Sequence, residues 1–327
     1  MAAPDPLVLV TGAAGFIGRA LARKLRADRH LGPEGLLLTD QVIDGPGSLA
    51  GNVADASHQQ RLFTRPVGRL FHLAGIVSGA AEADFEAGLR VNLEATLALL
   101  ECCRRQAEAG GPRARFVYAS SIAVFGVPLP ARIDDHTPAL PTLSYGAHKR
   151  VIELLIDDYT RRGFIDGRAL RLPGVVVRPP LPNGALSGFN SDLIREPLAH
   201  RSYTCPVGPQ ATTWLCSLPR VIDNLLRLSE LPGETIGAVR TVNAPALAVS
   251  VAQIVAALAQ VDAQAPARVR FADAPAPGLV AQFGAWPLAC TFDRAGALGL
   301  SADADLAALL RDGLPSSDLL PSSDLLP

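Results

Sequence analysis

The chain has 327 residues, of which 49% are hydrophobic and 19% are charged. Its 30 basic residues nearly cancel its 31 acidic ones and form no cluster, which argues against nucleic acid as a partner. Five cysteines without a Cys-x-x-Cys pair argue against a disulfide framework, and no apolar run approaches the roughly 18 residues of a membrane span. We expect a cytoplasmic protein with a small ligand and no membrane association.

From residue 7 onward, short β-type segments alternate with longer helical ones, which is typical of a parallel sheet with helices on both faces. The predicted fold class is therefore α/β, a Rossmann-type doubly wound parallel sheet. Its expected strands are Leu7–Thr11, Gly35–Asp40, Arg69–Leu73, Ala114–Ser120 and Arg168–Leu172. Between the third and fourth strands, apolar residues at three- or four-residue steps predict one buried helical stripe, made of Phe85, Leu89, Leu93, Leu97 and Leu100.

The regular alternation stops after Arg178, where Pro179–Gly188 predicts a loop into different architecture. We expect residues 1–178 to form the Rossmann domain, and residues 179–313 to form a smaller C-terminal α/β subdomain from which some segments return to the Rossmann sheet. Residues 314–327 hold the hexapeptide Leu-Pro-Ser-Ser-Asp-Leu twice and are interpreted as a low-complexity tail. In the subdomain, helices are expected at Leu218–Leu231 and Ser250–Gln260, and strands at Arg240–Asn243 and Arg268–Phe271.

A glycine-rich turn follows the first strand and opens a helix, with glycines at positions 12, 15 and 18. Glycines at this spacing permit a tight turn, a close approach of the backbone to a pyrophosphate, and packing of the helix on the strand. The phosphates of a dinucleotide would then lie at the positive end of the helix. The predicted phosphate-binding residues are Gly12, Ala14, Gly15, Phe16, Ile17 and Gly18.

Asp40 ends the second strand, twenty-two residues after Gly18, where a carboxylate can accept hydrogen bonds from the adenosine ribose. Because that carboxylate would repel a 2′-phosphate, we expect NAD in preference to NADP. Asn52 and Val53 are expected to flank the adenine. Leu73, Ala74 and Gly75, after the third strand, are expected to pass close to the phosphates.

Tyr145 and Lys149 stand four residues apart in a segment with helical periodicity, so they are expected on one helix face. A neighbouring ammonium and an oxidised nicotinamide would stabilise the phenolate, which suits Tyr145 to general-base work. Ser121 ends the fourth strand at the carboxyl edge of the sheet and is expected to hold a substrate oxygen. The sequence thus predicts a Ser121, Tyr145 and Lys149 constellation for proton transfer.

These motifs resemble the extended short-chain dehydrogenases/reductases, specifically the NAD-dependent epimerase/dehydratase group. The resemblance rests on the glycine turn, on Ser120–Gly126 (SSIAVFG) and on Tyr145–Lys149 (YGAHK). Three further stretches, His72–Gly79, Arg162–Pro173 and Ile194–Leu198, resemble dehydrogenases of four-carbon sugar acids. The likeness runs from about Leu7 to Ala304.

The resemblance implies NAD as cofactor and oxidation of the C2 hydroxyl of D-erythronate to the 2-keto acid. It further implies that Asn92 helps to order the inner helix and a proton path, and that the chain around Leu172, Pro173 and Val175 meets the nicotinamide. A homodimer is expected from the group, formed by the helices around residues 85–100 and 145–159. Gly174 departs from the pattern, which has a threonine-like residue there, and Leu218 departs in a turn before Arg220.

A sugar acid requires a cation for its carboxylate, and a bidentate arginine is the natural choice. Arg195 is the first candidate because it follows the loop expected on the substrate side, with Arg220 and Arg178 as alternatives. The substrate hydroxyls are assigned to Ser78, Ser121, Thr142 and Tyr145, with Ser187 and Ser191 as further candidates.

Two other functions stay open. A nucleotide-sugar epimerase with tightly bound NAD would use the same motifs, whereas the dehydratases of the group carry an acidic pair where this chain has Ile122 and Ala123. A non-catalytic NAD sensor would retain the fold, but such proteins usually lose the tyrosine or the lysine. No metal is expected, since the six histidines show no ligand spacing with one another or with cysteine.

Overall fold

The computed structural model describes residues 5–27, 31, 34–180, 186–274, 279–280 and 284–314. A seven-stranded sheet with the order β11-β7-β5-β4-β1-β2-β3 forms its centre, and each neighbouring pair is parallel. This confirms the predicted doubly wound α/β fold. The strands are β1 (Leu7–Thr11), β2 (Leu36–Asp40), β3 (Ser48–Ala50), β4 (Val67–His72), β5 (Arg115–Ser121), β7 (Asp166–Leu172) and β11 (Thr241–Asn243).

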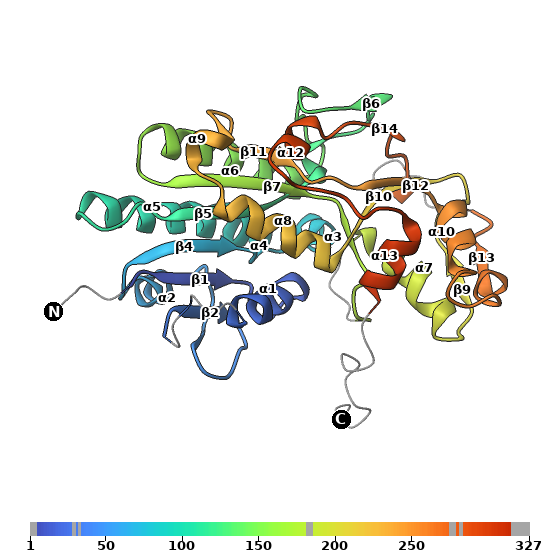
Figure 1. The fold of residues 1–327 in the computed structure, drawn as a ribbon, viewed down its shortest axis with the longest axis horizontal. Coiled ribbons are helices and arrows are strands. Elements are labelled where there is room, and N and C mark those ends of the chain that lie inside the picture. Colours follow the sequence, from blue (N-terminus) through green and yellow to red (C-terminus); the bar gives the residue numbers. More distant parts are fainter. Residues whose placement is uncertain are drawn as a thin grey trace.

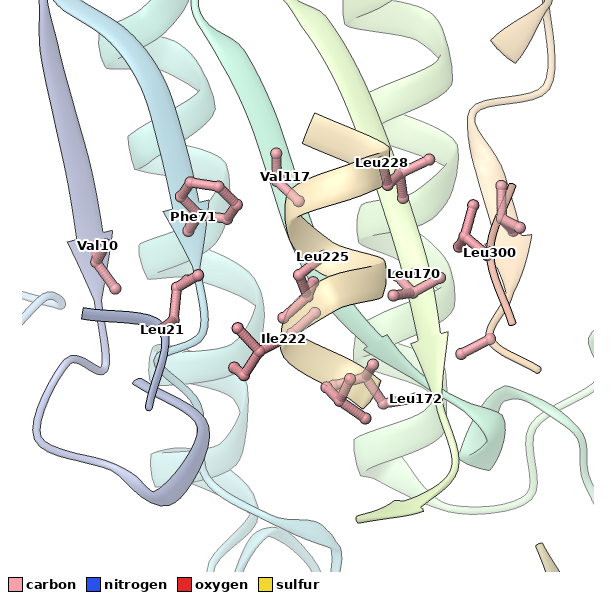
Figure 2. Packing of buried hydrophobic residues seen from close by; sticks show 14 of the residues in the cluster. Val10, Leu21, Phe71, Val117, Leu170, Leu172, Ile222, Leu225, Leu228 and Leu300 are labelled. Atoms are coloured by element: carbon pink, nitrogen blue, oxygen red, sulfur yellow. The ribbon is translucent and has the colours of Figure 1, made fainter. Parts of the chain in front are cut away.

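Helices cover both faces of this sheet. On one face, α1 (Phe16–Arg26) packs beside α8 (Leu218–Glu230), and Leu21, Ile222 and Leu225 meet the strands in one apolar cluster (Figure 2). On the other face lie α2 (Ala56–Leu62), α5 (Ala95–Glu108) and α6 (Ser144–Arg161). Because both faces are buried, the strands are almost continuously apolar, as in β1, where every residue is buried.

The buried stripe predicted between residues 85 and 100 is wrong in its register. The segment is three helical pieces, α4 (Phe85–Gly88), the π-helix η1 (Leu89–Glu94) and α5, and a π-turn accommodates extra residues that rotate the following face. Leu97, which follows the π-turn, is 37% exposed, and Phe85, which precedes it, is 58% exposed. Leu100 is buried as predicted, and the buried face also carries Val91, Asn92, Ala95, Thr96 and Leu99.

A smaller unit lies beyond the carboxyl ends of the strands, toward which β1 and β4 point in Figure 1. Its core joins apolar residues of α7 (Phe189–Leu198), α10 (Val251–Leu258) and α13 (Leu306–Gly313). Its sheets have the orders β12-β10-β8 and β13-β9. The strands are β8 (Gly174–Val176), β9 (Tyr203–Cys205), β10 (Thr212–Ser217), β12 (Leu247–Ser250) and β13 (Val269–Phe271).

The chain after Arg178 crosses between the two units several times. β11 pairs with β7 in the main sheet, and α12 (Asp293–Ala297) joins the apolar cluster on the same face as α8. Residues 181–185 of the loop expected at Pro179–Gly188, and all of the repeat-bearing tail after Leu314, lie outside the described residues. The remaining elements are α3 (Ser78–Ala83), β6 (Arg132–Ile133), α9 (Gly233–Ile236), β14 (Ala289–Cys290) and the short 3₁₀ turns η2 (Ile122–Val124), η3 (Leu186–Gly188) and η4 (Ala265–Arg268).

Candidate active site

The turn between β1 and α1 has the geometry of a dinucleotide cradle. Gly12 adopts a φ of +70°, and a Cβ there would lie 2.6 Å from the amide nitrogen of Ala74. A Cβ on Gly18 would lie 2.0 Å from the carbonyl oxygen of Gly12, so a side chain would separate turn and helix. All three glycines line the cavity, and Gly15 has the most room, since the nearest neighbour of its Cβ would be 3.2 Å away. No side chain caps the first turn of α1, which leaves its N–H groups to a phosphate.

Asp40 is held in place by the same turn. Its Oδ2 accepts a hydrogen bond from the amide of Ala14 at 2.9 Å, and its Oδ1 accepts one from the amide of Gln41 at 2.8 Å. Asn52 closes a local turn, since its Oδ1 accepts from the amide of Ala54, and the side chain of Val53 is buried. The cradle and the carboxylate therefore form one rigid unit at the edge where β1 and β2 end.

The loop after β4 passes beneath this cradle. Leu73 and Gly75 line the cavity, and a Cβ on Gly75 would lie 3.0 Å from Asn92 Oδ1 and 3.8 Å from Lys149 Nζ. Asn92 bonds the loop through both of its amide atoms, accepting from the amide of Ile76 at 2.8 Å and donating to its carbonyl at 2.9 Å. Thus Asn92 fixes the loop, and the glycine leaves space next to the lysine ammonium.

The three predicted catalytic residues share one cavity. Tyr145 and Lys149 lie one turn apart on α6, and Ser121 lies at the end of β5, directly beside them in the lining. Ser121 is close enough to the phenol of Tyr145 to lower the pKa of that phenol. Lys149 Nζ donates to the carbonyl of Ala119 at 2.8 Å and lies 4.5 Å from the ring centroid of Tyr118 and 5.5 Å from that of Tyr145.

Burial controls the ionisation of this group. It lowers the pKa of the Lys149 ammonium to about 7, while the carboxylate of Glu153 acts in the opposite direction. Burial raises the pKa of Tyr145, while the hydrogen bond from Ser121 and the charge of Arg178 lower it. The Tyr145 phenol is therefore protonated near neutral pH. A positive charge brought close to the phenol favours its ionised form.

Beneath the catalytic residues lie two buried polar networks that the sequence analysis did not assign. His72 bridges Thr11 and Thr96, with its Nδ1 2.7 Å from Thr11 Oγ1 and its Nε2 2.8 Å from Thr96 Oγ1. Burial and the nearby Lys149 ammonium lower the pKa of His72 to about 3, so the imidazole is neutral near pH 7. In the sequence, only the position of His72 near the end of the third predicted strand indicated that it would lie close to the catalytic residues.

The second network lies one turn further along α6. The fully buried carboxylate of Glu153 accepts hydrogen bonds from Ser120 at 2.6 Å and from Arg171 at 2.9 and 2.8 Å. Arg150 pairs with it at 3.2 Å. Because Tyr145, Lys149 and Glu153 are spaced by four residues, this anchored carboxylate holds the helix face that presents the first two.

The substrate end of the cavity differs from the sequence prediction. Ser78, Thr142, Ser121 and Tyr145 line the cavity, together with Leu172, Pro173 and Val175. Arg195 does not: its guanidinium pairs with Asp192 and Glu196, and its Nη1 donates to the carbonyl of Arg178 at 2.7 Å. Arg178 lines the cavity instead. Residues that spacing could not locate, Asn190, Thr213, Trp214 and Trp286, complete this end.

Among the described residues, no three or more potential metal-ligating side chains gather, and no helix has the length and apolarity to span a membrane. The cavity has a volume of about 300 Å³ and runs from the glycine turn to Trp286. The residues fit NAD: a glycine cradle faces an uncapped helix terminus, the carboxylate of Asp40 is hydrogen-bonded to the same turn, and a glycine opens space beside Lys149.

Residues 8–204 match the NAD dependent epimerase/dehydratase family. The chain is 42% identical to D-erythronate dehydrogenase from Cupriavidus necator, over 93% of this chain and 96% of that protein. It is 35% identical to D-erythronate dehydrogenase from Haemophilus influenzae, over 93% and 97%. A crystal structure titled as a nucleoside-diphosphate-sugar epimerase from Agrobacterium tumefaciens is 32% identical, with a TM-score of 0.85 over 95% of both chains.

The chain belongs to the NAD-dependent epimerase/dehydratase family, the extended branch of the short-chain dehydrogenases/reductases. Its Rossmann fold and its cavity are those of an NAD-binding oxidoreductase of that class. Within the class it is an NAD-dependent dehydrogenase.

Proposed function

We propose that this dehydrogenase oxidises the C2 hydroxyl of a four-carbon sugar acid, D-erythronate, to the 2-keto acid. The observation that carries the proposal is a single cavity lined by Gly15, by Ser121, Tyr145 and Lys149, and by the cation Arg178. A 2-hydroxy acid places a carboxylate one bond from the carbon to be oxidised, so its enzyme needs a cation next to its base. The similarity to two D-erythronate dehydrogenases over 93% of the chain supports the choice of acid.

In this proposal, NAD held by the glycine turn would supply the hydride acceptor for C2 and a positive charge close to the phenol. Tyr145 takes the hydroxyl proton, and Ser121 holds the same oxygen by a hydrogen bond. Lys149, anchored on the carbonyl of Ala119, stabilises the phenolate as it forms. Gly12, Gly15, Gly18 and the N-terminus of α1 bind the pyrophosphate, and Asp40 binds the ribose hydroxyls.

The test is NADH formation by the purified protein with NAD and D-erythronate, with NADP and L-threonate as alternatives. We expect turnover with NAD and D-erythronate, at least about 10²-fold slower turnover in Tyr145→Phe, and a preference for NAD over NADP. Absence of NADH with any four-carbon acid would contradict the proposal.

A nucleotide-sugar epimerase is the second candidate, favoured by the Agrobacterium tumefaciens structure that carries that description. It predicts conversion of a UDP-sugar by protein with bound NAD and no net NADH. A protein that binds NAD but turns over no alcohol would be a sensor instead.

We further propose that residues 1–178 act mainly as the cofactor domain and residues 179–313 mainly as the substrate-binding part, in a cytoplasmic homodimer. Apolar side chains on the outer faces of the neighbouring helices α5 and α6 support the dimer: Leu97, Val151 and Leu154 are 37%, 40% and 52% exposed. Sedimentation of Leu154→Glu tests this, since a dimer through these helices would dissociate.

A further inference from the structure

We propose that Arg178, Asn190 and Thr213 form an acid-recognition subsite, in which Arg178 binds the substrate carboxylate and Asn190 with Thr213 binds the hydroxyl groups beyond C2. This inference rests on the proposed function and assigns its substrate contacts. Asn190 lies on α7 and Thr213 on β10, two separate elements of the smaller unit. Both residues and Arg178 line the cavity that holds Tyr145.

Arg178, which is half-buried, differs in its charge environment from the buried arginines of the protein. Arg168 pairs with Asp166 and Arg171 with Glu153. In the part of the chain that the structure describes, no carboxylate pairs with Arg178, and the Tyr145 phenol is the group whose charge it senses. Among the described residues, its Nε donates to the carbonyl of Val175 at 3.1 Å. A half-buried guanidinium that no described carboxylate neutralises is matched by an anionic ligand.

The backbone of Arg178 is clamped by α7. Its amide donates to Ser191 Oγ at 3.0 Å, and its carbonyl accepts from Arg195 Nη1 at 2.7 Å. Arg195 is itself fixed by ion pairs with Asp192 and Glu196. Arg195 is therefore a positioning residue that acts through Arg178, which gives a structural reason for its place next to the substrate loop without direct substrate contact.

Asn190 supplies the second half of the subsite. Its side chain is buried, with 1% exposure, and its Nδ2 donates to Thr213 Oγ1 at 3.2 Å. Its Oδ1 has no hydrogen-bond partner among the described residues. A buried amide oxygen without a partner costs free energy, and a substrate hydroxyl reaching this end of the cavity would satisfy it.

Gly174 keeps this region open. A Cβ at this position would lie 3.0 Å from the carbonyl oxygen of Trp214 and 3.6 Å from Asn190 Nδ2. A larger residue would therefore fill space next to the amide that we assign to the substrate hydroxyls. The departure from a threonine-like residue noted in the sequence thus falls inside the subsite.

The experiment compares an acid with its neutral isostere. We expect Arg178→Gln to lower kcat/KM for D-erythronate by about 10² to 10³-fold, mainly through KM, and to change kcat/KM for D-erythronamide less than about 3-fold. Arg178→Lys should recover part of the loss, because it restores the charge without the planar fork. Because Arg195 acts through Arg178, Arg195→Gln should lower kcat/KM for the acid by a smaller factor than Arg178→Gln does, again with less effect on kcat/KM for the amide. The exposed Arg161→Gln should change kcat/KM for neither substrate. Equal losses for acid and amide in Arg178→Gln would overturn the subsite.

Asn190 is tested by binding to NADH-loaded protein, measured by calorimetry with D-erythronate and with 2-hydroxybutyrate, which lacks hydroxyls beyond C2. Asn190→Leu should weaken D-erythronate by about 10-fold and leave 2-hydroxybutyrate within about 2-fold. Equal weakening would overturn the hydroxyl assignment.

Binding and turnover together separate the two proposals. If the wild type binds D-erythronate in an Arg178-dependent manner but forms no NADH, the subsite stands and the proposed reaction is wrong. If the wild type oxidises D-erythronate while Arg178→Gln keeps its acid-to-amide ratio, the reaction stands and the subsite is wrong. If the NADH-loaded wild type binds neither acid, the subsite is wrong.

Discussion

The cofactor cradle and the acid subsite lie at the two ends of one cavity, but they are built in different ways. The cradle comes from one continuous segment, residues 11–18, and its function depends on backbone that must come close to a ligand or to a neighbouring turn. The subsite combines side chains of Arg178, Asn190 and Thr213, which converge only when three elements fold together. A local backbone requirement can be recognised in the sequence as a fixed spacing of glycines. A site formed by side chains from distant segments has no such spacing.

Arg195 shows the consequence of this difference. Its place after the substrate-side loop made it the first candidate for the carboxylate, and the structure surrounds it with two acids and the carbonyl of Arg178. Such an arginine is already neutralised. Arg178 lines the cavity, and we assign the substrate carboxylate to it, although the sequence analysis named Arg178 only as an alternative to Arg195.

The largest expected effect on activity comes from Tyr145, between the cofactor cradle and the acid subsite. Tyr145→Phe should lower kcat by about 10² to 10⁴-fold, because it removes the group that accepts the proton. NADH binding, followed by fluorescence, should change less than about 3-fold, since the cradle is untouched. If Tyr145→Phe retains a tenth of the wild-type activity, another residue is the general base.

The cradle itself is probed by a matched pair of glycine variants. Gly18→Ala should lower the free energy of unfolding by about 2 kcal/mol or more, because its Cβ would meet the Gly12 carbonyl at 2.0 Å. Gly15→Ala should cost less than about 1 kcal/mol but weaken NAD binding at least about 10-fold, since its Cβ enters the cavity. Urea unfolding and NAD titration of both variants measure the two effects. Equal effects on stability would show that Gly15 is structural.

His72 beneath the catalytic residues should make the protein sensitive to acid. In the folded protein its pKa is lowered to about 3, whereas the pKa of a histidine in the unfolded chain is near its ordinary value of 6.5. Between these pH values the unfolded chain binds one proton more, so stability contributed by neutral His72 is lost as the pH falls from 6.5 toward 3. The slope is at most about 1.4 kcal/mol per pH unit.

Urea unfolding of wild type and His72→Gln between pH 3 and 7 checks this. The variant should be less stable near pH 7, because the bridge between Thr11 and Thr96 is altered, but its stability should fall less steeply with acid. Parallel pH profiles for the two proteins would contradict the assignment.

The smallest expected change concerns cofactor choice. Asp40→Asn should lower kcat/KM for NAD by about 10 to 10²-fold, since a charged acceptor is replaced by a neutral amide, and should narrow the preference over NADP. Asp44→Asn, in the exposed loop after β2, is the matched control and should leave both values unchanged. An unaltered NAD-to-NADP ratio in Asp40→Asn would show that the ribose hydroxyls are bound elsewhere.

Much of this protein is determined by the sequence alone. The alternation of apolar strands and helices specified the doubly wound sheet, because strands buried on both faces must be almost wholly apolar. The spacing of Gly12, Gly15 and Gly18 predicted the turn, since backbone clearance is a local demand. The four-residue step from Tyr145 to Lys149 predicted a shared helix face.

Only the tertiary structure decided the rest. The π-helix at Leu89–Glu94 changed the register of the helix that follows it, and Leu97 is exposed, because helical register depends on what the helix packs against. The ion pairs of Arg195 with Asp192 and Glu196, and the place of Arg178 in the cavity lining, are the observations on which we propose Arg178 for the carboxylate. The spacing of residues along the chain specifies neither the register of this helix nor the ion-pair partners of the two arginines.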